Sequence, residues 1–220
     1  MSWALRLTQD RLAADARLTL GAAPRVVWVR EGGASIGDGT TAREIAASEA
    51  WHGTGAATVT GGPGGTVALR WELTATAALP PVSATAGVDS LRLLEHPIDV
   101  DAARAWLMRC DRVEFAPGGV ALPHGHKGAG IRCLIAGTLE VTVGEEPPRV
   151  MQPGGAWFEN GREPVLAKAS AEMPTAFIRV SILPREIRGQ SSIVYVDPQD
   201  ASRGRPRRYT VYVDEAIELP

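Results

Sequence analysis

The stretch Pro117-Gly-Gly-Val-Ala-Leu-Pro-His124-Gly-His126-Lys-Gly-Ala-Gly130-Ile-Arg132 holds two of the four histidines in a chain of 220 residues. Glycines and prolines surround the H-x-H pair, and an apolar run begins at Ile131. In an extended segment the side chains alternate between two faces, so both imidazoles lie on one face and are close enough to share a cation. The stretch therefore predicts a strand that presents two histidines together.

On both sides of this stretch, short runs rich in β-branched and aromatic residues alternate with turn-forming residues. The 24 glycines and 16 prolines are spread along the whole chain. This pattern favours an all-β sandwich or barrel. Helical signals are weak, at 41–50 and 99–108, and we expect a strand after Ala105. The main expected strands are 26–29, 66–73, 131–135, 139–143, 176–183, 193–196 and 209–219.

Composition and charge exclude several classes of function. The formal net charge is −2 at pH 7, which argues against a surface for nucleic-acid phosphates or anionic membranes. The sequence has no apolar run long enough to span a bilayer and no signal-peptide core. Cys110 and Cys133 lack C-x-x-C spacing, so we expect two buried thiols in a cytoplasmic protein.

The chain also shows weak internal similarity at a nearly constant offset. Gly32 ends a run that resembles the one ending at Gly137, Trp51 corresponds to Trp157, and Arg70 corresponds to Arg179. Such similarity indicates a duplicated unit. The expectation is two tandem β-barrels, at 1–88 and 89–220, joined by the segment 75–87 and with 209–219 as an extension strand. A single large sandwich is the alternative.

Residues 110–185 resemble a cupin domain, and the duplication makes the whole chain resemble a bicupin with a degenerate N-terminal domain. The family's first motif, G-x5-H-x-H-x3-E-x6-G, is matched at all positions but its glutamate, where Gly130 stands; the matches are Gly118, His124, His126 and Gly137. The second motif, G-x5-P-x-G-x2-H-x3-N, is matched only at its first glycine; the residues at its five defined positions are Gly154, Asn160, Arg162, Val165 and Ala169. Two of the family's four metal ligands are thus kept.

The resemblance implies two jelly-roll barrels and a single divalent metal ion (Fe, Zn, Mn or Ni), weakly bound or missing because two ligands are lost. Glu159 is the nearest carboxylate that could complete the metal shell, with Glu114 and Glu140 more distant. With His124 and His126 it would give the two-histidine, one-carboxylate set of iron(II) oxygen chemistry. The alternative is that Glu159 faces solvent or pairs with an arginine.

Arg132 is the candidate for substrate binding. If the period of two continues from His124, Arg132 points its guanidinium into the space that Gly130 leaves. A buried guanidinium needs an anionic partner. That partner is either a protein carboxylate or a substrate carboxylate held by a bidentate pair. Trp157 and Phe158 would line the barrel or its rim, as core residues or as a platform for the substrate.

Two functions remain open at this point. One is a metal-dependent enzyme, dioxygenase-like or isomerase- or decarboxylase-like, that acts on a small carboxylated substrate in the C-terminal barrel. The other is a barrel without a tightly bound metal that captures or senses a small anion. The offset from His124 and His126 leads to Thr19 and Gly21, so the N-terminal barrel should lack a metal. The resemblance further implies a homodimer formed through sheet edges.

Overall fold

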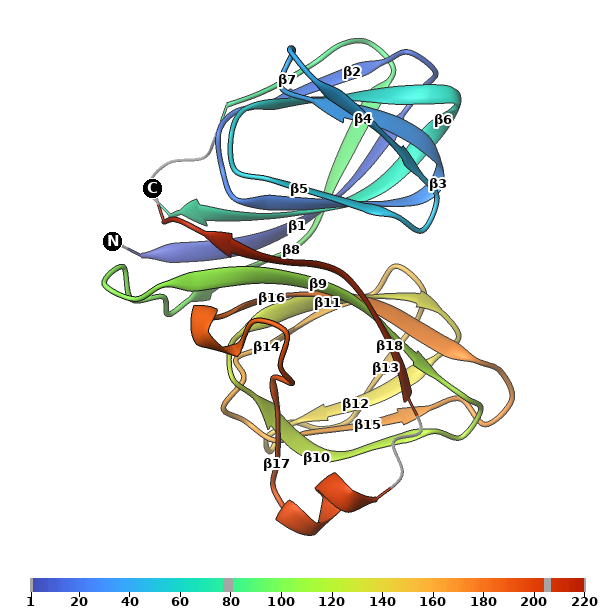
Figure 1. The fold of residues 1–220 in the computed structure, drawn as a ribbon. Coiled ribbons are helices and arrows are strands. Elements are labelled where there is room, and N and C mark those ends of the chain that lie inside the picture. Colours follow the sequence, from blue (N-terminus) through green and yellow to red (C-terminus); the bar gives the residue numbers. More distant parts are fainter. Residues whose placement is uncertain (1, 77–80, 204–206, 220) are drawn as a thin grey trace. The chain divides into compact units, whose positions relative to one another are not determined.

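The computed structural model describes residues 2–76, 81–203 and 207–219. They form strands β1 to β18 and the short 3₁₀ helices η1 and η2, so the all-β prediction is confirmed (Figure 1). The chain divides into two compact units, residues 1–103 with 217–220 (unit 1) and residues 104–216 (unit 2). No helix in the described part of the chain is long and apolar enough to cross a membrane.

Unit 1 is built from one antiparallel sheet with the path β4-β3-β6-β1-β8. Strand β2 pairs with β6 and β7, and β5 pairs with β3. The strands are β1 Trp3–Leu12, β2 Arg17–Leu20, β3 Arg25–Gly37, β4 Ala42–Ala46, β5 Ala50–Gly53, β6 Ala57–Ala75, β7 Val82–Ala84 and β8 Val88–Ile98.

The long strand β6 lets this sheet curl around its own core. Its first residues pair with β2 and its second half pairs with β1, so β6 joins these two strands into one sheet. The apolar side chains enclosed by the sheet form one buried cluster; its members include Leu12, Leu18, Val27, Val29, Ile36, Val59 and Ala68.

The boundary between the units differs from the expected one between residues 88 and 89. Strand β8 pairs with β1 along its length, from Val88 opposite Leu12 to Ile98 opposite Trp3, so residues 89–98 belong to unit 1. The expected connection at 75–87 contains β7, which pairs with β2, and residues 77–80 lie outside the described residues.

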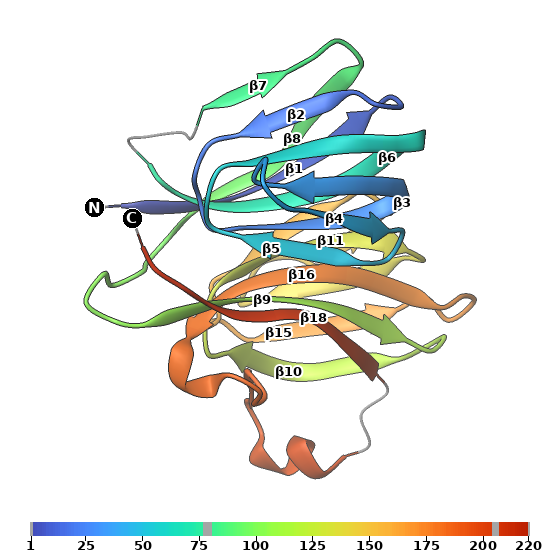
Figure 2. The same cartoon turned by 45° about the horizontal axis from the view of Figure 1, so that its top comes forward.

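Unit 2 consists of two five-stranded antiparallel sheets, ordered β14-β11-β16-β9-β18 and β13-β12-β15-β10-β17. Figure 2 shows β11, β16, β9 and β18 running side by side. The strands are β9 Trp106–Phe115, β10 Val120–His126, β11 Gly130–Ala136, β12 Leu139–Val143, β13 Arg149–Met151, β14 Ala156–Glu159, β15 Val165–Ala169, β16 Thr175–Pro184, β17 Ile193–Tyr195 and β18 Arg207–Ile217; η1 is Arg185–Ile187 and η2 is Pro198–Ser202.

The apolar core of unit 2 lies between its two sheets. Alternate residues of each strand point into it, as the period of a β-strand requires. The cluster includes Val113, Phe115, Leu134, Leu139, Val141, Trp157, Val165 and Phe177. Continuing the same inward faces along β9, β11, β14 and β16 leads to buried charged residues: Asp111, Arg132, Glu159 and Arg179.

Five strands of the sheet in unit 1 follow the same order as one sheet of unit 2. The series β5-β3-β6-β1-β8 in unit 1 matches β14-β11-β16-β9-β18 in unit 2. In unit 1, Val27 lies opposite Trp51 on one side and Arg70 on the other. In unit 2, Arg132 lies opposite Trp157 and Arg179 in the same way. The tryptophans and arginines noted in the sequence thus occupy equivalent places.

Most expected strands are present with close limits. The run 139–143 coincides with β12, and the strand expected after Ala105 is β9, which begins at Trp106. The expected extension strand is β18, which lies beside β9. The weak helical signal at 41–50 was misleading, because Ala42–Ala46 pairs with β3 as strand β4.

Candidate functional site

The two histidines of the H-x-H motif lie together inside unit 2. His124 and His126 are 4% and 7% exposed, their ring centroids are 4.9 Å apart, and both line one internal cavity. Strand β10 places them there because residues two apart share a face. Nδ1 of His124 lies 2.7 Å from the carbonyl oxygen of Leu122. Since a carbonyl only accepts, Nδ1 carries a proton and donates it in this contact.

Glu159 and Arg132 form a buried ion pair beside these histidines. Nη2 of Arg132 lies 2.6 Å from Oε2 of Glu159, and Nη1 donates to the carbonyl oxygen of Gly130 at 2.6 Å. The register pairs Gly130 with Glu159 and Arg132 with Trp157, so the carboxylate and the guanidinium meet diagonally across β11 and β14. Of the two partners expected for Arg132, the structure thus supplies the protein carboxylate.

Both oxygens of Glu159 have protein neighbours. Oε1 accepts a hydrogen bond of 2.8 Å from Nε1 of Trp157, and Oε2 lies 3.3 Å from Nε2 of His126 as well as close to Arg132. Trp157 therefore acts as a buried core residue that holds the carboxylate in place.

Burial and charge determine the protonation of this cluster. Burial lowers the pKa of His126 to about 3, and the charges of Arg179 and Arg132 lower it too, so its ring is neutral at pH 7. Burial raises the pKa of Glu159, but the charge of Arg132 and the contacts with His126 and Trp157 outweigh it and bring the pKa below its usual range. Burial lowers the pKa of Arg132 to about 10, which leaves it charged.

The cavity enclosed by these side chains is small. Its volume is about 20 Å³, which is room for about one water molecule. Apolar residues complete its wall, among them Val113, Leu139, Val141, Val165 and Phe177. A substrate together with a hydrated ion does not fit into this space as it stands.

Two sequence-based expectations near this cavity need correction. Phe158 is half-buried and has the opposite parity to Trp157 and Glu159 on β14, so its side chain does not line the cavity. Gly130 does not leave a space either. A Cβ at this position would meet the carbonyl oxygen of Val180 and would lie 2.7 Å from Oγ of Ser181. Strand β16 fills the place that the family's glutamate would need.

The remaining carboxylates suggested as ligands lie in other ion pairs. Glu114 pairs with Arg112, and Glu140 pairs with Lys168. The motif glycines, in contrast, have a clear structural role. Gly137 has φ +71°, a region that disfavours side chains, and a Cβ there would lie 2.6 Å from the carbonyl oxygen of Pro174.

The side chains present do not fit a divalent metal ion. Glu159 is already neutralised by Arg132, and the two guanidinium groups that lower the pKa of His126 would also repel a cation. Among the described residues, no group of three or more His, Cys, Asp or Glu side chains is arranged to hold a metal. His124, His126 and Glu159 thus come together without forming a ligand set.

A second, larger cavity of about 390 Å³ lies in the same unit. Strands β9, β16 and β18 and the loop 189–193 line it, and Arg179 and Tyr209 line both this cavity and the small one. The sequence did not indicate this site as a whole, because its wall combines a loop with three strands that are distant in sequence. The available signals were the alternation of Arg109 and Asp111 along 106–115 and the correspondence of Arg179 with Arg70.

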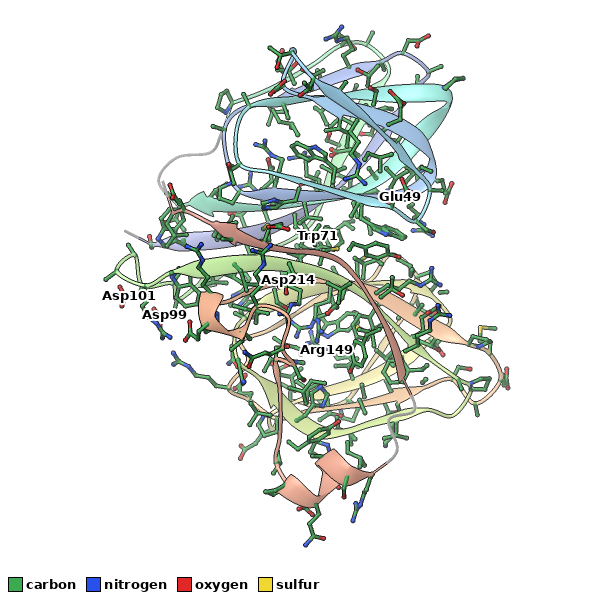
Figure 3. All side chains as sticks on the ribbon, viewed as in Figure 1. Glu49, Trp71, Asp99, Asp101, Arg149 and Asp214 are labelled. Atoms are coloured by element: carbon green, nitrogen blue, oxygen red, sulfur yellow. The ribbon has the colours of Figure 1, made fainter. Side chains whose placement is uncertain are left out.

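Two ion pairs lie in the wall of the larger cavity, one buried and the other partly exposed at its aspartate. Arg179 binds Asp111 through Nε at 3.0 Å and Nη2 at 2.6 Å. Arg109 binds Asp214, which Figure 3 labels on β18, and also donates to the carbonyl oxygens of Ile187 and Gln190. Within the described part of the chain, no residue accepts a hydrogen bond from Nη1 of Arg179. A guanidinium has five N–H donors, so Arg179 retains donors for a ligand.

No family model and no curated protein matches this sequence. Among solved structures, AerE from Microcystis aeruginosa shares 14% identity over 80% of this chain and 87% of its own, with a TM-score of 0.59. An oxalate decarboxylase from Bacillus subtilis shares 12% identity over 90% of this chain and 74% of its own, with a TM-score of 0.60. The 11S allergen from Cocos nucifera shares 11% identity over 92% and 88%, with a TM-score of 0.64. At such identities the likeness establishes the fold and no activity: the chain folds as two tandem jelly-roll barrels of the cupin type.

Proposed function

We propose that unit 2 binds a small carboxylated molecule in the 390 Å³ cavity, with Arg179 as the group that recognises the carboxylate. The cavity volume lies in the range of about 300 to 1,000 Å³ that is typical of small-molecule sites. The observation that carries the proposal is the position of Arg179. It is held rigidly by Asp111, lines the cavity, and has donors at Nη1 that no described residue uses.

Arg179 suits this role better than the two neighbouring arginines. Arg132 is bound to Glu159 and to the carbonyl oxygen of Gly130, and it does not line the larger cavity. Arg109 lines it, but its guanidinium donates to Asp214 and to two backbone carbonyls. Burial lowers the pKa of Arg179, but Asp111 outweighs this and raises it above its ordinary value, so its charge persists.

A binding or sensing role therefore has more support than metal-dependent catalysis. The enzyme interpretation, whether dioxygenase-like or isomerase- or decarboxylase-like, depends on a metal held by His124, His126 and Glu159. The ion pair between Arg132 and Glu159 opposes such a site. We assign no reaction to the barrel.

We also propose that the chain is a bicupin whose unit 1 is the degenerate copy. The matching strand order and the equivalent places of Trp51 with Trp157 and of Arg70 with Arg179 support a duplication. In each unit this arginine forms an ion pair with an aspartate on the next strand, Asp10 in unit 1 and Asp111 in unit 2. Cys110 and Cys133 are buried and form no disulfide within the described residues, and we propose the reducing cytoplasm as the location.

Ligand binding is tested by thermal unfolding with succinate and benzoate as probes and benzamide as the uncharged control. Binding to the folded state raises the melting temperature by mass action, so we expect a shift with the carboxylates and none with the amide. Ser191→Trp should remove the shift, because Ser191 lies on the exposed loop that lines the cavity. Ser83→Trp, at an exposed position in unit 1, is the matched control.

A second variant examines the recognition group itself. Arg179→Lys keeps the charge but loses the fork that binds Asp111 and the ligand together, so it should weaken carboxylate binding about 10-fold or more, in line with a charge-assisted hydrogen bond. An equal shift with benzamide, or an unchanged shift in Ser191→Trp, would refute the proposal.

A further inference from the structure

Each unit contains arginines and carboxylates that alternate in its interior. In unit 1, Nε of Arg25 donates to Glu72 at 3.0 Å, Glu72 also pairs with Arg70, and Arg70 binds Asp10 through Nε at 2.7 Å and Nη2 at 3.1 Å. All four side chains are buried. Two arginines and two carboxylates carry equal and opposite charge, so this cluster has no net charge.

Unit 2 contains the same kind of buried arginine–carboxylate pairs, with its arginines on the equivalent strands. Arg132 pairs with Glu159, and Arg179 pairs with Asp111. Arg179 is the counterpart of Arg70 in the strand register, and each binds the aspartate of the neighbouring strand. The difference is that unit 2 has two imidazoles next to its arginine and glutamate, whereas the side-chain hydrogen bonds and ion pairs described for this cluster in unit 1 involve no imidazole.

We infer that the guanidinium of Arg132 is the built-in cation of unit 2 and occupies the place that a divalent metal would need between His126 and Glu159. Oε2 of Glu159 is the atom that both groups approach, 2.6 Å from Nη2 of Arg132 and 3.3 Å from Nε2 of His126. A metal bound there would have to share this oxygen with a fixed positive charge. A guanidinium does not lose its proton at ordinary pH, so it cannot make room by becoming neutral.

Unit 1 serves as an internal comparison. Its buried carboxylates Asp10 and Glu72 are paired with arginines, and these pairs include no imidazole, so a barrel of this topology needs no metal to balance its buried carboxylates. Removal of the charge of Arg132 should therefore convert His124, His126 and Glu159 into a site for a divalent cation. This expectation is independent of carboxylate binding in the larger cavity, because Arg132 does not line that cavity.

The test uses Co(II) as the probe, because its visible absorption reports on its ligands. Wild-type protein without an affinity tag should bind no Co(II) in the small cavity beside His126 and Glu159. Neither Co(II) nor a chelator should change its unfolding midpoint. Arg132→Met should gain about one Co(II) per chain, and Arg132→Met with His126→Ala should lose it. Arg109→Met is the matched control, because it removes the ion-pair partner of Asp214, a carboxylate whose described hydrogen bonds involve no imidazole; it should bind none.

Three results would overturn the inference. The first is wild-type protein that binds Co(II) as tightly as Arg132→Met. The second is a folded Arg132→Met that binds none. The third is an Arg132→Met variant that fails to fold both with and without Co(II). A Co(II) ion bound by His124, His126 and Glu159 would replace the positive charge of Arg132, so Co(II) should restore folding if the inference is right. The wild-type measurement is informative whether or not the variant folds.

Discussion

The guanidinium of Arg132 and the carboxylate of Glu159 lie 2.6 Å apart inside unit 2, with 1% and 6% of their side chains exposed. Removing one partner of a buried pair leaves the other charge without compensation, which costs about 3 to 5 kcal/mol. We therefore expect Glu159→Gln to lower the free energy of unfolding by about that amount in urea titrations. The side-chain oxygen of the introduced glutamine can still accept a hydrogen bond from Nε1 of Trp157.

The double variant Arg132→Met with Glu159→Gln is the control for this pair. It removes both charges, so its loss of stability should be smaller than that of Glu159→Gln alone. If the double variant is less stable by the sum of the two single losses, the residues do not interact.

Stability should decrease when the pH falls from 7 to 4. His126 has a pKa of about 3 in the folded protein, whereas an unfolded histidine has a pKa of about 6.5. Between these values only the unfolded state binds the proton, so acid favours unfolding by about 1.4 kcal/mol per pH unit for this group. The pKa of Glu159 is lowered in the folded protein, so this carboxyl destabilises the protein further only below about pH 4.3, where the unfolded carboxyl becomes protonated.

Urea midpoints measured between pH 7.5 and 4 give this slope, and His126→Gln should make it shallower. An identical slope in the variant would mean that other groups cause the pH dependence.

The hydrogen bond from Trp157 to Glu159 should contribute measurably to stability. A hydrogen bond to a charged group contributes about 1.5 to 3 kcal/mol, and Trp157→Phe removes it together with part of the ring. Trp28→Phe removes the same atoms from a buried indole whose Nε1 has no hydrogen-bond partner among the described residues. The difference between the two losses, measured by chemical unfolding, should lie in that range. Equal losses would show that the bond has no net effect.

Gly130 should not accept the glutamate that the family's motif has at this position. A Cβ there meets the backbone of β16 and lies 2.9 Å from Cα of Ser181. Crowding of this kind costs about 1 to 3 kcal/mol, so we expect Gly130→Ala to lower the unfolding free energy by that amount. Gly64→Ala, where no atom lies within 4 Å of the added Cβ, should change it by less than about 0.5 kcal/mol. A fully stable Gly130→Ala would mean that β16 can move aside.

The sequence predicted well those features that depend on local alternation. The strand at 139–143 has the predicted limits, and the H-x-H spacing correctly predicted two imidazoles on one face, because neighbours two apart in a strand share a face whatever the strand pairs with. The sequence also predicted the correspondence of Trp51 with Trp157, which occupy equivalent positions in the strand register of the two units.

The partners across the sheets could not be derived in this way. That Glu159 meets Arg132 depends on the register of β11 against β14, and that residues 89–98 belong to unit 1 depends on the pairing of β8 with β1. The sequence alone determined which side chains point inward, because alternation is a property of one strand. Only the tertiary structure decided which of them touch, and hence that an arginine lies beside His126 and Glu159, because register joins residues that are far apart in the chain.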